Sequence, residues 1–197
     1  MLARLRTDGW RVVAPSRAEA DLFEPAAVAA AVARAAGDPT APLGAVVNLV
    51  GGFAQGGRVA ETPIEQFEAQ LRLNLRPTYL VTQAALPHLV AAGGGAVVCV
   101  GSRSALAPFP GAAGYVAAKA AVIAFAQAVA VEYRDERVRC NAILPSVIDT
   151  PANRAAMPDA DWTRLVAPAQ LAGEIAHLCS DDASAVSGAA IPVYGRV

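Results

Sequence analysis

The sequence of 197 residues has no surplus of either charge and no basic tract. It carries 16 Lys and Arg against 17 Asp and Glu, which gives a formal net charge of −1. Proteins that bind nucleic acid neutralise phosphates with clustered basic side chains. No apolar run reaches the length of a membrane span, and the first ten residues lack the apolar stretch of a signal peptide. We therefore expect a cytoplasmic protein with no nucleic-acid or membrane partner.

Cysteine is also scarce. The three cysteines are odd in number and far apart in the sequence, and two of them lie in strand-like segments. This pattern argues against a disulfide framework and against a metal site, and it favours free buried thiols in a reducing compartment. The residues concerned are Cys99, Cys140 and Cys179.

What the chain does have is apolar sequence, at 55% hydrophobic residues against 17% charged. The length predicts a single domain over residues 1–197. Short runs rich in valine and isoleucine, without polar alternation, alternate with helical patterns, and this predicts a doubly wound parallel α/β sheet with helices on both faces. The expected strands lie in residues 10–15, 44–52, 95–102, 138–145 and 189–195, and the expected helices in residues 24–37, 63–91, 112–134 and 168–181.

The long helix over residues 63–91 has a marked start and an internal break. Thr62 and Glu65 form a T-x-x-E pattern that predicts a capping box at its start. Pro77 cannot donate a backbone hydrogen bond, so the helix should bend close to Asn74. An asparagine at a bend within an apolar helix has two interpretations, a functional polar group or a local partner for the bend.

Tyr115 and Lys119 stand four residues apart in an expected helix, and Ser102 ends the strand before it. Residues at positions i and i+4 share one helix face. An ammonium about 4 Å from a phenol stabilises the phenolate by roughly 4 kcal/mol at an effective dielectric near 20. We therefore expect Lys119 to lower the pKa of Tyr115, which would let the phenol exchange a proton with an alcohol near neutral pH.

Taken together, these segments resemble the short-chain dehydrogenase/reductase family from about Trp10 to Tyr194. The last matching segments also resemble the family, although Ser146 stands where it usually has glycine. A narrower likeness over residues 149–163 is to the quinonoid dihydropteridine reductases. The segments that carry the family resemblance, in order, are NLVGG (48–52), LNL (73–75), GSRSAL (101–106), YVAAK (115–119), NAILPSVIDT (141–150) and SGAAIPVYG (187–195).

The resemblance implies roles for four catalytic residues. Tyr115 would be the general acid or base, and Ser102 would orient the substrate oxygen and stabilise its developing charge. Lys119 would lower the pKa of Tyr115 and hydrogen-bond the nicotinamide ribose. Asn74 would hold a water that links Lys119 to solvent.

The resemblance also implies a nicotinamide cofactor, NADP with NAD as the alternative. Arg17 follows the expected first strand, where a basic residue suits a 2′-phosphate. The other expected cofactor contacts are Asp21 and Leu22 at the adenine, Asn48 and Gly51 on the adenosine side of the cleft, and Ile148 and Thr150 at the carboxamide, besides Tyr115 and Lys119.

One part of the family pattern is missing. The family opens with a strand, a glycine-rich turn and a helix that cradle the pyrophosphate, whereas this sequence has only Gly9 in its first 36 residues. Two explanations stay open: a start codon placed too far downstream, or residues 10–15 sliding inward to pair beside residues 45–50.

The leading hypothesis is an oxidoreductase that transfers a hydride between NADP(H) and a small carbonyl or secondary alcohol. The alternative is a non-redox binding or scaffolding protein of the same fold, and cofactor-free isomerase or dehydratase chemistry is a third possibility. The two long helices are apolar around much of their circumference, which favours a homodimer or homotetramer unless the domain itself buries them. The residues behind this expectation are Leu86, Leu89, Val122, Phe125 and Val129.

Overall fold

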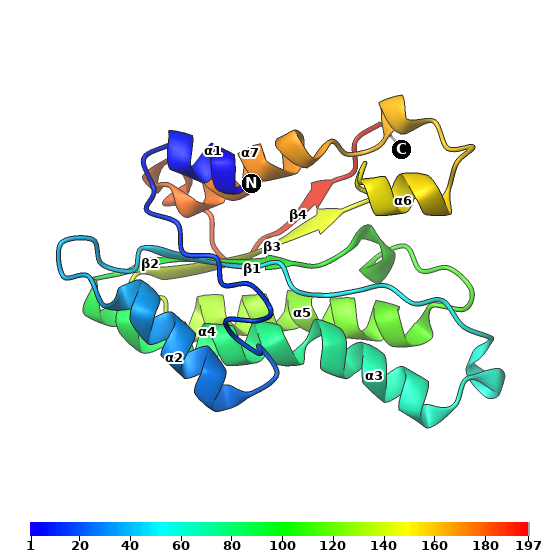
Figure 1. Ribbon diagram of the computed structural model, residues 1–197, viewed down its shortest axis with the longest axis horizontal. Coiled ribbons are helices and arrows are strands. Elements are labelled where there is room, and N and C mark those ends of the chain that lie inside the picture. Colours follow the sequence, from blue (N-terminus) through cyan, green and yellow to red (C-terminus); the bar gives the residue numbers. More distant parts are fainter. Residues whose placement is uncertain (197) are drawn as a thin grey trace.

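The computed structural model describes residues 1–196 and contains one sheet of four parallel strands (Figure 1). The order across the sheet is β1 (Ala45–Asn48), β2 (Gly95–Val100), β3 (Val138–Pro145) and β4 (Ala190–Val193). Each strand falls within an expected segment, so the predicted parallel α/β fold is confirmed. The longer helices are α2 (Pro25–Ala36), α3 (Ile64–Asn74), α4 (Arg76–Ala91), α5 (Ala113–Glu132) and α7 (Pro168–Cys179), and the short ones are α1 (Leu2–Thr7) and α6 (Pro151–Ala156).

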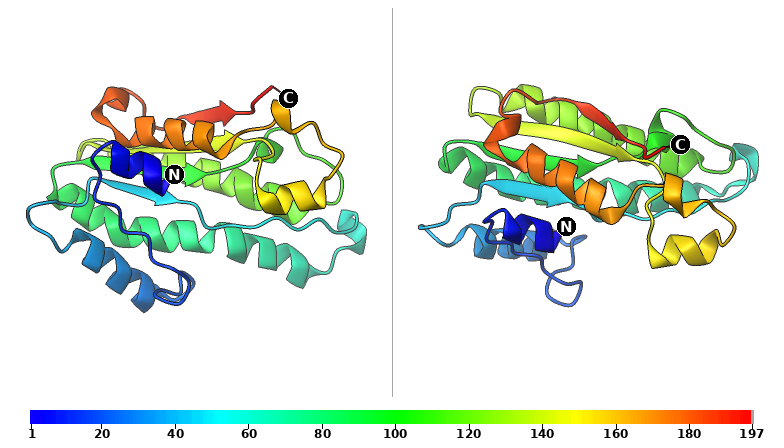
Figure 2. Two further views of the ribbon diagram at one scale, coloured as in Figure 1. Left: turned by 45° about the horizontal axis from the view of Figure 1, so that its top comes forward. Right: turned by 90° about the horizontal axis from the view of Figure 1, so that it is seen from above.

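Helices cover both faces of the sheet (Figure 2). On one face α4 and α5 pack against β2 and β3 through a core that includes Leu89, Val122 and Val129. On the other face α7 packs against β2 through Ile175 and Leu178. Within residues 1–196, α5 is the one helix long and apolar enough to cross a membrane by length and composition, with a mean hydropathy of 1.6. Its contacts with β2 and β3 account for that apolar character.

The apolar residues on the long helices do not argue for association, because the protein itself buries them. Leu86, Leu89, Val122 and Val129 are each at most 6% exposed within the protein itself. Phe125 is partly buried and packs against the same core. The domain's own core therefore explains these positions.

The long helix is broken near Asn74, where Pro77 led us to expect a bend. α3 ends at Asn74 and α4 begins at Arg76, because Pro77 in the first turn of α4 has no N–H to offer the preceding turn. The predicted capping box is wrong. Pro63 is the N-cap residue of α3, and the Thr62 hydroxyl donates to the carbonyls of Gly57 and Arg58 in the preceding turn.

Residues 10–15 form no strand, which corrects one of the five expected strands and the idea that they pair beside residues 45–50. Residues 10–15 and β1 both line a cavity of about 720 Å³. We call this cavity the edge slot. Its lining includes Trp10, Leu22, Val28 and Val46. Within residues 1–196, β1 pairs only with β2, so its outer edge has no strand partner there.

Candidate active site

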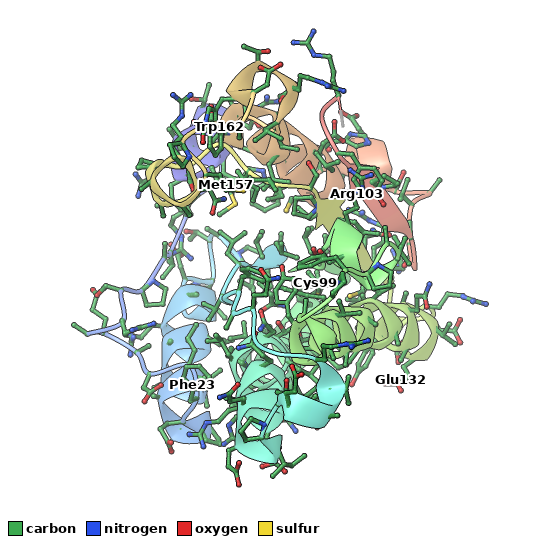
Figure 3. All side chains as sticks on the ribbon, turned by 90° about the vertical axis from the view of Figure 1, so that its right-hand side faces the viewer. Phe23, Cys99, Arg103, Glu132, Met157 and Trp162 are labelled. Carbon is green, nitrogen blue, oxygen red and sulfur yellow. The ribbon has the colours of Figure 1, made fainter. Side chains whose placement is uncertain are left out.

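The expected catalytic side chains lie at the carboxyl end of the sheet, where ligands bind in open α/β folds. Figure 3 looks onto this end, with Cys99 of β2 near the centre and Arg103 just beyond that strand. Ser102 follows β2 directly, and Tyr115 and Lys119 occupy the first two turns of α5. The fold brings them together because α5 packs back onto β2.

Lys119 is a buried ammonium held in a fixed position. It is 5% exposed, and its Nζ donates to the carbonyl oxygen of Val100 at 2.8 Å. Burial lowers the pKa of Lys119 to about 8, partly offset by the nearby Cys99 thiol. An apolar environment disfavours the charged form, so this lysine is poised close to physiological pH.

The Tyr115 phenol behaves differently from the sequence expectation. The Lys119 Nζ lies 5.9 Å from the centroid of the Tyr115 ring, so the two groups are neighbours. Burial nevertheless raises the pKa of Tyr115, and a hydrogen bond with Ser102 acts in the opposite direction. The expected lowering is therefore wrong for the protein without ligands, because desolvation of the phenolate exceeds the help it receives.

Ser102 is positioned by its own neighbour. It is 7% exposed and extended, and it caps the short turn that begins at Arg103. Its Oγ accepts from the backbone N–H of Ser104 at 3.1 Å and donates to the Ser104 hydroxyl at 3.2 Å. The turn therefore fixes the serine hydroxyl beside the tyrosine.

Asn74 clamps a loop instead of facing solvent. It is fully buried, its Oδ1 accepts from the Gly52 N–H at 3.1 Å, and its Nδ2 donates to the Gly52 carbonyl at 3.0 Å. The same amide donates to the carbonyl of Gln70. Asn74 thus fixes the backbone next to Gly51, and its expected role in holding a water stays a prediction.

Gly51 sits where only a residue without a side chain fits. A Cβ at this position would lie 2.7 Å from Asn74 Oδ1 and 3.1 Å from Lys119 Nζ. Asn48, at the end of β1, donates to the Thr82 hydroxyl at 3.0 Å and is 6% exposed. Gly51 therefore lies beside Lys119, and Asn48 lies at the end of β1. Their expected contacts on the adenosine side of the cleft stay predictions.

The remaining expected cofactor residues are more scattered. Ile148 forms an isolated bridge with Val166, and the Thr150 hydroxyl accepts from the Asn153 N–H at the start of α6. Arg17 and Asp21 are exposed on the turns after residues 10–15. Leu22 lines the edge slot, which also reaches Asn48. The structure thus connects Leu22 and Asn48 through one cavity.

Sequence reasoning missed two aromatic side chains at the site. The Phe53 ring meets the Tyr115 ring edge-on at 5.1 Å between centroids, and the Phe109 ring lies 6.0 Å from that of Phe53. Phe53 follows Gly51 by two residues, and Phe109 precedes Tyr115 by six. Their proximity to motif residues was the available signal, but it required the loops to meet in space.

A nicotinamide cofactor fits one half of its expected site. The open backbone at Gly51 and the buried ammonium of Lys119, which has N–H donors beyond the one given to Val100, suit a ribose and its ring. The half of the site expected to hold the pyrophosphate fits the cofactor less well. Residues 1–36 contain Gly9 alone and no glycine-rich turn ahead of a helix, so they provide no phosphate cradle of that kind.

Comparison with known proteins gives a consistent result. Residues 8–195 match the family model described as enoyl-(acyl carrier protein) reductase. The chain is 32% identical over 191 residues to 2-(R)-hydroxypropyl-CoM dehydrogenase from Xanthobacter autotrophicus, covering 91% of this chain and 76% of that protein.

Solved structures resemble the fold as closely. A short-chain type dehydrogenase/reductase from Mycobacterium ulcerans has a TM-score of 0.84 and 27% identity, over 90% of this chain and 68% of that one. ElxO with NADP bound has a TM-score of 0.81 and 24% identity, over 89% and 75% of the two chains. The first shares sequence and fold with this protein, and the second shows a likeness of fold.

Proposed function

The chain belongs to the short-chain dehydrogenase/reductase family, and on that premise we propose that it transfers a hydride between NADP(H) and a small carbonyl or secondary alcohol substrate. Tyr115 is the general acid in the direction of reduction and the general base in the reverse direction. The observation that carries this proposal is the group formed by half-buried Tyr115 with buried Lys119 and Ser102 at the carboxyl end of β2.

The raised pKa of Tyr115 suits the direction of reduction. A phenol whose pKa lies above its ordinary value keeps its proton at neutral pH and can donate it to a carbonyl oxygen that becomes negative. When bound, the nicotinamide cofactor supplies or accepts the hydride. The carbonyl carbon gains that hydride and its oxygen gains the Tyr115 proton, so the product is the alcohol.

The neighbours of Tyr115 prepare that proton transfer. The Ser102 hydroxyl is held next to Ser104, and it can turn its one proton from the Ser104 hydroxyl to the same substrate oxygen. The Lys119 ammonium stabilises the phenolate left after transfer, and it needs no reorganisation because Val100 already holds it. Asn74 keeps the loop around Gly52 in place beside both groups.

The finer points of the proposal follow from charge and burial. Arg17 is exposed and has no ion-pair partner among residues 1–196, which favours a 2′-phosphate and hence NADP over NAD. All three cysteines are buried free thiols, which suits the cytoplasm. A homodimer or homotetramer stays a proposal that rests on the family resemblance. The narrower likeness to dihydropteridine reductases stays a prediction.

Loss of NADPH absorbance with small aldehydes and ketones tests the proposal, with Tyr115→Phe as the diagnostic variant. We expect saturable NADPH binding in both proteins and a loss of turnover of roughly 10²–10⁴-fold in the variant. Full activity in Tyr115→Phe would refute the mechanism. Absence of any saturable change in NADPH fluorescence would favour a non-redox binding protein.

A further inference from the structure

Two segments at the proposed active site contain no charged residue, and one of them carries Tyr115. One runs from residue 49 to 57 (LVGGFAQGG) and the other from 104 to 118 (SALAPFPGAAGYVAA). A charged substrate would find no counter-ion on either segment.

The two segments are fastened to each other. The backbone N–H of Gly56 donates to the carbonyl of Gly111 at 2.8 Å, and the Gln55 side chain donates to the carbonyl of Pro110 at 3.2 Å. Phe53 and Phe109 meet across the same junction. Their rings are therefore held relative to Tyr115 by backbone as well as by packing.

Both rings keep a large free surface. Phe53 is 55% exposed and Phe109 39% exposed, although each has an aromatic neighbour. Exposed apolar side chains that gather beside a reactive group form a surface that a ligand can cover. Leu106 on the same segment as Phe109 is also exposed, at 62%. The surface around the tyrosine is thus apolar and in part aromatic.

Three cations on other parts of the chain are already engaged. The Arg103 guanidinium stacks over the Tyr194 ring at 5.2 Å. Arg154 pairs with Asp149 and also lies over the Trp162 ring. Lys119 is buried and held by Val100. No cation on the two segments remains to select an anionic substrate.

We propose that Phe53 and Phe109 are specificity-determining residues that select neutral substrates carrying a flat aromatic ring beside the carbonyl. This inference rests on the proposed function and names its substrate class. The free faces of the two rings hold the substrate ring, and the carbonyl then lies at the Tyr115 hydroxyl. Offset and edge-on ring pairs stabilise a complex beyond simple burial, which gives an aromatic substrate an advantage over a saturated one.

The first test compares three aldehydes of similar size: benzaldehyde, cyclohexanecarbaldehyde and 4-carboxybenzaldehyde. We expect the wild-type protein to prefer benzaldehyde in kcat/KM over both others. Phe53→Ala should lower the ratio of benzaldehyde to cyclohexanecarbaldehyde about five-fold, mainly through KM, as expected for one ring pair. Phe53→Leu, which keeps apolar area without the ring, should lower the ratio as well.

The chain offers a matched control. The rings of Tyr79 and Phe125 lie 5.7 Å apart with an interplanar angle of 52°, close to the 6.0 Å and 52° of Phe53 and Phe109. Tyr79 of α4 is exposed, and Phe125 of α5 is partly buried against the core. Tyr79→Ala should leave the substrate ratio unchanged. An unchanged ratio in Phe53→Ala, or a preference for 4-carboxybenzaldehyde, would overturn the proposal.

A binding measurement separates this inference from the proposed function. Benzamide and cyclohexanecarboxamide are unreactive analogues, and their affinities for Tyr115→Phe can be compared by ligand-observed NMR. We expect tighter binding of benzamide, and the difference should disappear when Phe53→Ala is added. Selective benzamide binding without turnover of any aldehyde would refute the oxidoreductase and leave the aromatic site in place. Turnover of aldehydes without selective benzamide binding would refute the aromatic site and leave the oxidoreductase in place.

Discussion

The inner strands and the outer edge of this sheet differ in how completely their groups are partnered. β2 and β3 pair on both sides and carry a core in which Leu89, Val97 and Leu144 are wholly buried. β1 pairs on one side only, and its other edge faces the 720 Å³ edge slot. The proposed chemistry stands at the end of the partnered strands. Adenosine contacts are expected on the side of the slot.

The comparison teaches where the protein is organised before any ligand binds. Lys119, Ser102 and Asn74 each form hydrogen bonds within the protein. Preorganised groups of this kind give large effects when they are removed, because nothing nearby can replace them. Side chains around the slot border open space and should respond more weakly.

The largest effect is expected for Lys119→Met. The change keeps length and apolar character but removes the charge that stabilises a Tyr115 phenolate. We expect kcat to fall about 100- to 1,000-fold, or roughly 3–4 kcal/mol in activation free energy. Steady-state kinetics at pH 7 measure this. A loss below about three-fold would mean that the ammonium takes no part in the chemistry.

The same variant gives a pH signature in stability. Burial lowers the pKa of Lys119 from 10.5 to about 8. The unfolded chain therefore binds more protons between pH 8 and 10.5, so this group makes wild-type stability rise with pH across that window. Lys119→Met should lose that rise. Urea unfolding of both proteins at pH 7, 8, 9 and 10 tests the sign, and equal slopes would contradict the buried charge.

The second largest effect is expected for Asn74→Leu, and comparison with Asn141→Leu separates its effect on stability from its effect on catalysis. Asn74 clamps Gly52, and Asn141, which is 1% exposed, clamps the segment before β4 through the Val186 carbonyl and the Ala189 N–H. Each Asn→Leu change leaves part-buried backbone groups without partners and should lower the free energy of unfolding by about 1–3 kcal/mol. Only Asn74→Leu should also lower kcat, by about ten-fold, because Gly52 borders the site.

Denaturant unfolding and steady-state kinetics on the two variants are the measurements. Equal losses of kcat in Asn74→Leu and Asn141→Leu would show that the effect is general destabilisation. Equal stabilities with the wild type would show that the clamps are dispensable.

The sequence predicts the inner strands of the sheet better than its outer edge. Strands with two neighbours were predictable because buried parallel strands read as continuous apolar runs, and the break at Asn74 was predictable because Pro77 has a fixed local effect. Residues 10–15 carry the same kind of apolar run and form no strand. Strand formation needs a partner edge, which no local pattern supplies.

The candidate site divides in a similar way. The spacing of Tyr115 and Lys119 fixed their common helix face, and the structure brings the two side chains together. The direction of the Tyr115 pKa could not be derived from spacing, because it depends on burial by residues far away in the sequence. Phe53 and Phe109 are 56 residues apart, and only the meeting of two loops makes them neighbours. Long-range contact is the missing information in each case.

The next smaller effect compares the two regions by overpacking. Ala142 of β3 is fully buried, whereas Ala31 of α2 is 7% exposed and lines the edge slot. Ala142→Leu forces three extra carbons into a filled core and should lower the free energy of unfolding by about 1–3 kcal/mol. Ala31→Leu places the same atoms beside open space and should change it by less than about 0.5 kcal/mol. Equal losses would mean that the slot is not open in solution.

The smallest effect concerns the slot side of cofactor recognition. Arg17 is exposed and follows the segment that lines the slot, so its guanidinium is free to meet a 2′-phosphate. Arg17→Ala should raise KM for NADPH about ten-fold, which corresponds to roughly 1.4 kcal/mol, and leave KM for NADH unchanged. Arg134→Ala is the control, since Arg134 is an exposed arginine just after the end of α5, away from the slot. Equal changes in KM for both cofactors would mean that Arg17 does not bind the 2′-phosphate. The side of the sheet next to β1 would then have no residue that distinguishes NADPH from NADH.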